Sequence, residues 1–174
     1  MNTNQNVEDL DCLIIGGGPA GLTAAIYLAR FHLSVLLIDD GRSRAAMIPV
    51  THNQAGFPGG IAGAELLTRM RDQASLYGAR FDAGKVLSLK PEVGSLLVAK
   101  TEFHRWRAKT VLLATGVVNT RPKMAKAIHD EALACGLLRY WPVCDGYEVT
   151  DRRIGVIGTG EYGLREAEFL RSFT

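Results

Sequence analysis

Two neighbouring residues in the stretch RYWPVCDGYE, at positions 139–148, have side chains suited to redox and acid–base chemistry. Cys144 supplies a thiol and Asp145 a carboxyl group, in a segment where Pro142 and Gly146 predict a turn. A redox-active cysteine usually works with a second thiol, but Trp141 stands three residues upstream, where a C-x-x-C pair would have its other cysteine. Cys144 is therefore either a redox thiol without the usual partner or a chemically inert cysteine.

The other cysteines offer little help to Cys144. Cys135 lies nine residues upstream and would reach Cys144 only if the chain loops back. Cys12 lies in an apolar run, and we expect it in the core. Three cysteines at these spacings form neither a disulfide framework nor a zinc pattern, and the four histidines stand alone, so we expect no metal site.

A glycine-rich turn near the start of the chain has the spacing of a dinucleotide-binding motif. In GGGPAG, Gly16 would allow a tight turn, Gly18 a close approach of the backbone to a pyrophosphate, and Gly21 close packing of helix on strand. Asp39 follows Gly16 by 23 residues, at the end of the next apolar run, where a carboxylate can bind a ribose hydroxyl. The combination predicts dinucleotide binding; the alternative is a strand–helix turn without a ligand.

A second turn of the same kind, GTGEYG, lies about 140 residues further on and contains Gly158, Gly160 and Gly163. Two such turns in one chain indicate two dinucleotides. A flavin and a nicotinamide are the natural pair, because a flavin accepts hydride and passes electrons onward.

The elements that must position these residues follow an α/β pattern. Residues 11–40 predict a strand, a helix and a second buried strand, as in a parallel sheet. After a loop at 41–60, residues 63–79 predict an amphipathic helix. Residues 79–116 predict short strands that form a three-stranded antiparallel layer and lead into a buried strand, TVLLATG. We take residues 119–138 as a crossing between domains.

Residues 151–173 repeat the opening theme of strand, glycine turn and helix. The run RIGVIG, at 153–158, is apolar and typical of a buried parallel strand. A whole strand–helix–strand crossover takes about 30 residues, and the returning strand is not in the sequence. We therefore expect this region to be poorly ordered, or to be completed by another chain or a further C-terminal piece of a longer parent protein.

Composition limits the other possible functions. The 174 residues are 47% hydrophobic with a net charge of +2, as expected for a globular protein. Residues 100–126 hold seven basic residues and one acid, Glu102; this favours a solvated β-hairpin face over a nucleic-acid site, because no nucleic-acid motif accompanies it. The polar, acidic start does not read as a secretory signal, and no apolar run approaches the ~20 residues of a membrane span. We expect a cytoplasmic protein without nucleic-acid or membrane partners.

The chain resembles the thioredoxin-reductase-like pyridine nucleotide-disulfide oxidoreductases. The resemblance rests on IIGGGPAGLTAAIYLAR, GFPGG, GAELLTRMRDQASLYGA, VLLATG, CDGY and IGVIGTGEYGLREAEFL, which occur in the family's order and spacing over essentially the whole chain. It implies FAD on the first turn, NAD(P)H on the second, and a cytoplasmic homodimer. The expected FAD contacts are Gly16, Gly18, Pro19, Ala20, Gly21, Asp39, Thr115 and Gly116, and the expected NAD(P)H contacts are Gly158, Gly160 and Gly163.

The same resemblance gives the opening stretch a meaning. Cys144 takes the place of the thiol nearest the flavin, Asp145 that of the family's acid/base carboxylate, and Trp141 replaces the cysteine that exchanges with the protein substrate. The family's Gly-Gly-Gln segment is also missing; His52 and Asn53 of the replacing loop either contact the flavin or belong to a capped loop. The final Gly-Asp segment of the family's FAD domain has no counterpart in the sequence.

We therefore expect an α/β protein with a Rossmann-like FAD-binding domain and a small antiparallel layer at residues 1–118, followed at 119–174 by the start of a second Rossmann-like domain that binds NAD(P)H. The function predicted is electron transfer from NAD(P)H through FAD to an unidentified acceptor, without the paired cysteines. The alternative is a non-catalytic nucleotide-binding fragment of a longer flavoprotein.

Overall fold

The computed structural model describes residues 9–92, 94 and 96–174. It falls into two compact units. The first unit contains the chain up to Val50 and Ile61–Val117, and the second contains Thr51–Gly60 and Val118–Thr174. Residues 51–60 precede the helix at 63–76 in the sequence. They nevertheless belong to the second unit, together with the C-terminal residues.

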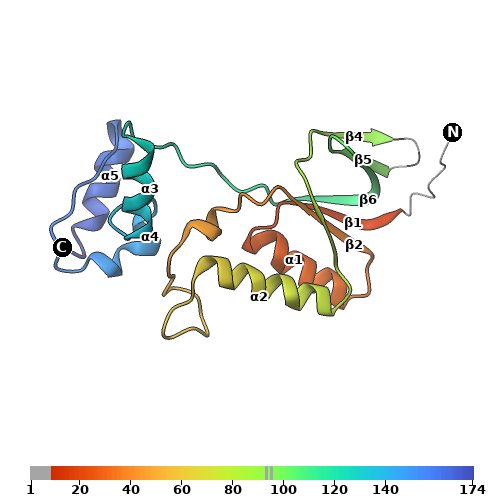
Figure 1. The fold of residues 1–174 in the computed structure, drawn as a ribbon, viewed down its shortest axis with the longest axis horizontal. Helices are drawn as coiled ribbons and strands as arrows, with labels where there is room; N and C mark the ends of the chain where they lie inside the picture. The colour runs from red at the N-terminus through yellow and green to blue at the C-terminus, as the bar shows by residue number, and fades with distance from the viewer. Residues whose placement is uncertain (1–8, 93, 95) are drawn as a thin grey trace. The chain divides into compact units, whose positions relative to one another are not determined.

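The first unit is built on one six-stranded sheet in the order β3-β2-β1-β6-β5-β4 (Figure 1). Its strands are β1 (Leu10–Ile15), β2 (Val35–Asp39), β3 (Arg80–Ala83), β4 (Ser88–Glu92), β5 (Leu96–Lys100) and β6 (Arg105–Leu113). β1 pairs in parallel with β2 and β6, and β2 with β3, whereas β4, β5 and β6 form antiparallel pairs. The expected α/β class and the three-stranded antiparallel part are confirmed.

Both faces of β1 are buried, which explains its unbroken apolar sequence. Cys12 and Ile14 pack with α1 (Pro19–Arg30) and α2 (Gly63–Leu76), two helices that lie together on the same side of the sheet (Figure 1). Leu13 packs on the opposite face with residues of β5 and β6. The prediction that Cys12 belongs to the core is confirmed.

β6 differs from the expected arrangement. The antiparallel strand and the strand at TVLLATG are one continuous strand, which pairs with β5 through Arg105–Ala108 and with β1 from Ala108 to Leu113. The expected burial of its end is wrong: Leu112 is 38% and Leu113 64% exposed. Neither side chain belongs to a hydrophobic core cluster of the described residues, and no strand among these residues pairs with 109–113 on the side away from β1.

The loop and helix predictions need smaller corrections. A short 3-10 helix, η1 (Arg44–Met47), lies within the predicted loop 41–60. α2 ends three residues before the predicted boundary at 79, because Gly78 adopts φ +93° and turns the chain towards β3.

Among the described residues of the second unit there are helices but no strands. They are α3 (Lys126–Ala134), α4 (Pro142–Asp145), the 3-10 turn η2 (Tyr147–Val149) and α5 (Gly160–Leu170). α3 lies within residues 119–138, the segment expected to cross between domains, and Cys144 lies in the one-turn helix α4 rather than in a simple turn.

The strand expected at 153–158 does not form. Those residues have no regular secondary structure and pair with no strand among the described residues, and Ile157 is 69% exposed. A strand needs a neighbour to satisfy its backbone groups, and the described part of the chain offers none at this position.

The described residues lack the features of a membrane span and of a metal site. They contain no helix long and apolar enough to cross a bilayer. They also contain no group of three or more His, Cys, Asp and Glu side chains that would hold a metal ion.

Candidate functional site

The first glycine turn joins β1 to α1 through very close backbone contacts. Gly16 has φ +114° and donates its N–H to the carbonyl of Ile38 at 2.9 Å. A Cβ at Gly16 would overlap the carbonyl oxygen of Ala114, and a Cβ at Gly21 would overlap that of Gly16. Gly16 and Gly21 are therefore required by the fold itself, which brings the start of α1 against the end of β1.

Gly18 is different because the protein leaves space around it. It is the N-cap of α1, with an ordinary φ of −76°, and a Cβ there would meet Ser43 Oγ at 3.3 Å. Within the described residues no side chain caps this helix, and Pro19 and Ala20 form its first turn. The free N–H groups and the positive end of the helix dipole suit a phosphate group.

Asp39, at the end of β2, is tied to the same turn. Its Oδ1 accepts a hydrogen bond from the N–H of Gly17 at 3.0 Å. A Cβ on Gly17 would lie 2.6 Å from the Asp39 carboxyl carbon, so this glycine is also required. The motif spacing names Gly16, Gly18 and Gly21 but passes over Gly17; the run of three glycines was the available signal.

Thr115 and Gly116 follow β6 and lie beside the turn. The N–H of Ala114 donates to the carbonyl of Ile15 at 2.9 Å, and a Cβ on Gly16 would be 3.2 Å from the Thr115 nitrogen. Gly116 has φ +64° and is exposed. The structure thus brings the predicted residues together at the carboxyl ends of the parallel strands β1, β2 and β6, where ligands bind in such folds.

The second turn repeats part of this geometry. A Cβ on Gly158 would be 2.7 Å from Gly163 Cα, so these two glycines are in backbone contact. Gly160 begins α5 with φ +61°, and Thr159 is the N-cap. The turn is formed although residues 153–158 before it form no strand.

Residues 139–148, the thiol segment, contain the one-turn helix α4, which carries Cys144 and Asp145. Trp141 is the N-cap, and its carbonyl accepts the N–H groups of Cys144 at 3.1 Å and Asp145 at 2.9 Å. A Cβ on Gly146 would lie 2.7 Å from the ring of Phe173, which packs against the end of the helix. Cys144 and Cys135 are both exposed free thiols.

Asp145 lies in a mixed electrostatic environment. Its partial burial raises the pKa of the carboxyl above the ordinary value, and the charge of Glu148 acts in the same direction. The Arg139 guanidinium, which donates to Asp145 Oδ1 at 3.3 Å, acts against them but does not reverse the upward shift. A raised pKa is useful to a group that must give and take protons.

His52 and Asn53 are engaged in local contacts. His52 Nδ1 lies 3.4 Å from Glu148 Oε1, and Asn53 Oδ1 accepts the hydroxyl of Thr51 at 2.6 Å. These contacts fit the capped-loop interpretation of the segment.

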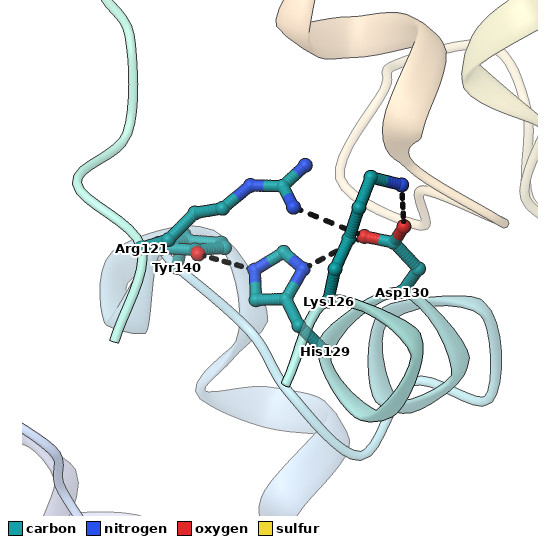
Figure 2. Close-up of polar contacts among 5 residues, drawn as sticks. All are labelled: Arg121, Lys126, His129, Asp130 and Tyr140. Carbon is teal, nitrogen blue, oxygen red and sulfur yellow. Dashed lines mark hydrogen bonds and ion pairs between the residues drawn. The ribbon is translucent and has the colours of Figure 1, made fainter. Parts of the chain in front are cut away.

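His129 forms a hydrogen-bonded cluster that the sequence did not indicate (Figure 2). Its side chain is buried, with the residue 2% exposed, and it contacts Asp130 Oδ1 at 3.0 Å and the Tyr140 hydroxyl at 2.7 Å. Hydrogen bonds from Lys126 and then His129 lower the pKa of Asp130 to about 2, and Arg121 lies 3.3 Å away. Because the ionised carboxylate of Asp130 only accepts, Nδ1 of His129 donates to it, and Nε2 makes the hydrogen bond to the Tyr140 hydroxyl.

Comparison with known proteins assigns the family. The family model described as "Pyridine nucleotide-disulphide oxidoreductase" matches residues 10–174. The chain belongs to this family. The expected resemblance to thioredoxin reductases is confirmed by relatives that match over almost the whole chain.

Among those relatives, the thioredoxin reductase of Aquifex aeolicus is 36% identical over 165 residues, 94% of this chain and 50% of that protein. That of Mycolicibacterium smegmatis is 37% identical over 182 residues, 99% of this chain and 54% of that protein. The crystal structure of thioredoxin reductase from Streptococcus pyogenes has a TM-score of 0.86 at 32% identity, covering 96% of this chain and 54% of that one. The chain spans about half the length of the curated relatives it matches.

Proposed function

We propose that this chain takes part in electron transfer from NAD(P)H through FAD to an acceptor, as a thioredoxin-reductase-like flavoprotein without paired cysteines. The observation that carries the proposal is the first glycine turn, with its open Gly18 and its Asp39–Gly17 hydrogen bond. Membership in the pyridine nucleotide-disulphide oxidoreductases implies the use of FAD and NAD(P)H.

The residues of the first turn fit an FAD molecule. The N–H groups at the start of α1 would hold the pyrophosphate next to Gly18, Pro19 and Ala20. With Oδ1 on Gly17, the second oxygen of Asp39 would accept hydrogen bonds from the ribose. Thr115 and Gly116 would border the flavin, which when bound accepts hydride and passes electrons on.

The second turn is our proposed site for the nicotinamide nucleotide. The contact between Gly158 and Gly163 keeps the start of α5 close to the preceding segment, and Gly160 lies at the helix N-terminus. The backbone N–H groups there would hold the nucleotide phosphates.

In the thiol segment, we propose that Asp145 acts as the acid/base group and that Cys144 has no thiol to exchange with. Trp141 occupies the position three residues before Cys144 and has no chemistry for a mixed disulfide. Electrons would then pass from the flavin to an acceptor without a cysteine pair.

We also propose a cytoplasmic homodimer whose acceptor is a small molecule or redox protein, with no nucleic-acid or membrane partner. The basic residues of β6 support the last point, since Arg105, Arg107 and Lys109 pair with Glu92, Asp9 and Asp11. Sedimentation of the purified chain tests the dimer.

A second candidate is a nucleotide-binding module without catalysis. The unpaired residues 153–158 favour it, because a nicotinamide site without sheet neighbours is poorly supported. Addition of NADPH or NADH to the FAD-bound chain distinguishes the two candidates. Loss of the flavin absorbance would show reduction and support the oxidoreductase, whereas unchanged absorbance would support the non-catalytic module.

FAD binding is the direct test of the proposal. The purified chain, mixed with FAD and freed of excess, should retain flavin absorbance. Gly18→Val should lose it, because the side chain would fill the phosphate position. Gly155→Val is the matched control, since a Cβ there meets no described atom within 4 Å. FAD retained equally by all three proteins would contradict the assignment of the first turn.

A further inference from the structure

Arg139 links the end of α3 to Asp145. Its Nε donates to the carbonyl of Gly136 at 3.1 Å, and its Nη1 donates to Asp145 Oδ1 at 3.3 Å. Gly136 turns the chain after α3 with φ +68°, and its N–H donates to Leu133 at 3.0 Å. The guanidinium is thus anchored on backbone before it reaches the carboxyl group.

The residue after Arg139 is anchored to the same helix. The Tyr140 hydroxyl bonds to the buried ring of His129, which is held in turn by Asp130 (Figure 2). The two contacts fix the segment that leads into α4 from α3. Arg139 is thus held through its own side chain and through the neighbouring Tyr140, both of which contact α3 or the turn that follows it.

The groups around Asp145 oppose one another. Burial and Glu148 favour the protonated carboxyl, whereas Arg139 favours the ionised form. Glu148 itself faces His52, and the ring of Phe173 covers the neighbouring Gly146. The helix α5, which contacts α4, carries the charged residues Glu161, Arg165, Glu166 and Glu168, of which Glu161 and Arg165 pair with each other, and Arg171 is its C-cap.

We propose that Arg139 is a positioning residue for Asp145: its guanidinium, anchored on the end of α3, fixes the carboxyl group and sets the pH range in which that group exchanges its proton. The inference rests on the proposed acid/base role of Asp145. It adds that the proton affinity of Asp145 depends on the guanidinium of Arg139, which is held on the turn after α3, and that the charge of Glu148 acts in the opposite direction.

The test is a pH titration of Asp145 in the purified chain, followed by NMR of ¹³C-labelled aspartate carboxyl groups and assigned with Asp145→Asn. Arg139→Gln and Arg139→Met should both move the titration to higher pH, because the ionised carboxylate loses its counter-charge. Arg139→Lys should move it less, because it keeps the charge but loses the anchored fork. Glu148→Gln should move it to lower pH. The measurement needs no flavin, so a chain that fails to bind FAD still reports on Arg139.

An unchanged Asp145 titration in a folded Arg139→Gln or Arg139→Met variant would overturn the proposal. Backbone amide spectra report whether each variant folds. If both neutral variants unfold while Asp145→Asn folds, Arg139 serves the fold rather than the carboxyl group, and the proposal is likewise overturned.

Discussion

Gly18 and Gly21 stand three residues apart in the same turn, yet they lack a side chain for different reasons. A Cβ on Gly21 would overlap the carbonyl of Gly16, whereas a Cβ on Gly18 would meet only the rotatable hydroxyl of Ser43 among the described residues. Gly21 is therefore required for packing, and we propose that Gly18 is required for the ligand.

This difference gives a prediction. Gly21→Ala should lower the free energy of unfolding by about 1–3 kcal/mol, because backbone must shift to admit the methyl group. Gly18→Ala should stay within about 0.5 kcal/mol of the parent in the absence of FAD. Urea unfolding measures both. Equal losses in the two variants would contradict the separation of roles.

The second prediction concerns Trp141. The chain should not turn over thioredoxin in an NADPH-coupled assay, because the exchanging thiol is missing. Trp141→Cys should form a disulfide with Cys144 under mild oxidation, since residue 141 is the N-cap of the turn that carries Cys144. Intact mass and thiol counting detect the bond.

Val143→Cys is the matched control for that experiment. It adds a thiol to α4 next to Cys144, where a disulfide between sequence neighbours is strained. The parent chain turning over thioredoxin, with activity lost in Cys144→Ser, would show that the single thiol suffices.

At this scale, sequence reasoning found the glycines, because their spacing follows from the turn geometry. It missed His129, since nothing in the sequence joins that histidine to Tyr140. The contact exists because α3 and the following turn bring the two side chains together, and a histidine alone carries no sign of such a partner.

Among the elements, β1 and β6 are linked by charge as well as by backbone hydrogen bonds. Lys109 donates to Asp11 Oδ1 at 2.7 Å, and Ser34 also donates to this carboxyl group. The hydrogen bond from Lys109, followed by those from Ser34, lowers the pKa of Asp11 from 3.8 to about 2. Because the folded-state pKa is depressed, this contribution is present above pH 3.8 and is lost as the pH falls towards 2.

The prediction is that Asp11→Asn reduces the acid sensitivity of the first unit. Its stability should fall less between pH 4 and pH 2 than that of the parent. Urea midpoints across this range, with the exposed Glu102→Gln as control, measure the effect. Parallel pH profiles for parent and Asp11→Asn would show that the Lys109–Asp11 pair does not couple folding to protons.

Local patterns predicted β1, α1, β2 and α5 well, because each has a clear apolar period or glycine boundary. They divided β6 into two strands, because its alternating basic half and apolar half look like separate elements. Only the pairing of both halves, with β5 and with β1, shows that they are continuous.

At the scale of the whole molecule, the two glycine turns differ in the strands that precede them. The first has a sheet of six strands around it, whereas the apolar residues 153–158 of the second have no strand neighbour among the described residues. Sequence reasoning expected a strand there, since RIGVIG has the composition of one. Composition shows what a segment can pair with, but pairing needs a second strand.

Hydrogen exchange tests this difference. Amides of residues 153–158 should exchange rapidly, because no ladder protects them, whereas those of β1 should exchange slowly. Mass spectrometry of peptides from both regions measures the rates. A monomer in which residues 154–170 exchange as slowly as β1 would contradict the prediction, because it would show that these amides are protected without a strand neighbour.

The position of β6 in the sheet also sets an order of events during synthesis. β1 pairs with β2 soon after it in the chain, but its other edge pairs with β6, which comes after α2 and three further strands. A ribosome making the chain must therefore release β1, α1 and β2 long before the central strand can be enclosed. Contacts between distant parts of a chain form slowly. The nascent protein thus carries an open, apolar edge of β1 through most of the translation of the first unit, and unpaired strand edges of this kind are prone to aggregation.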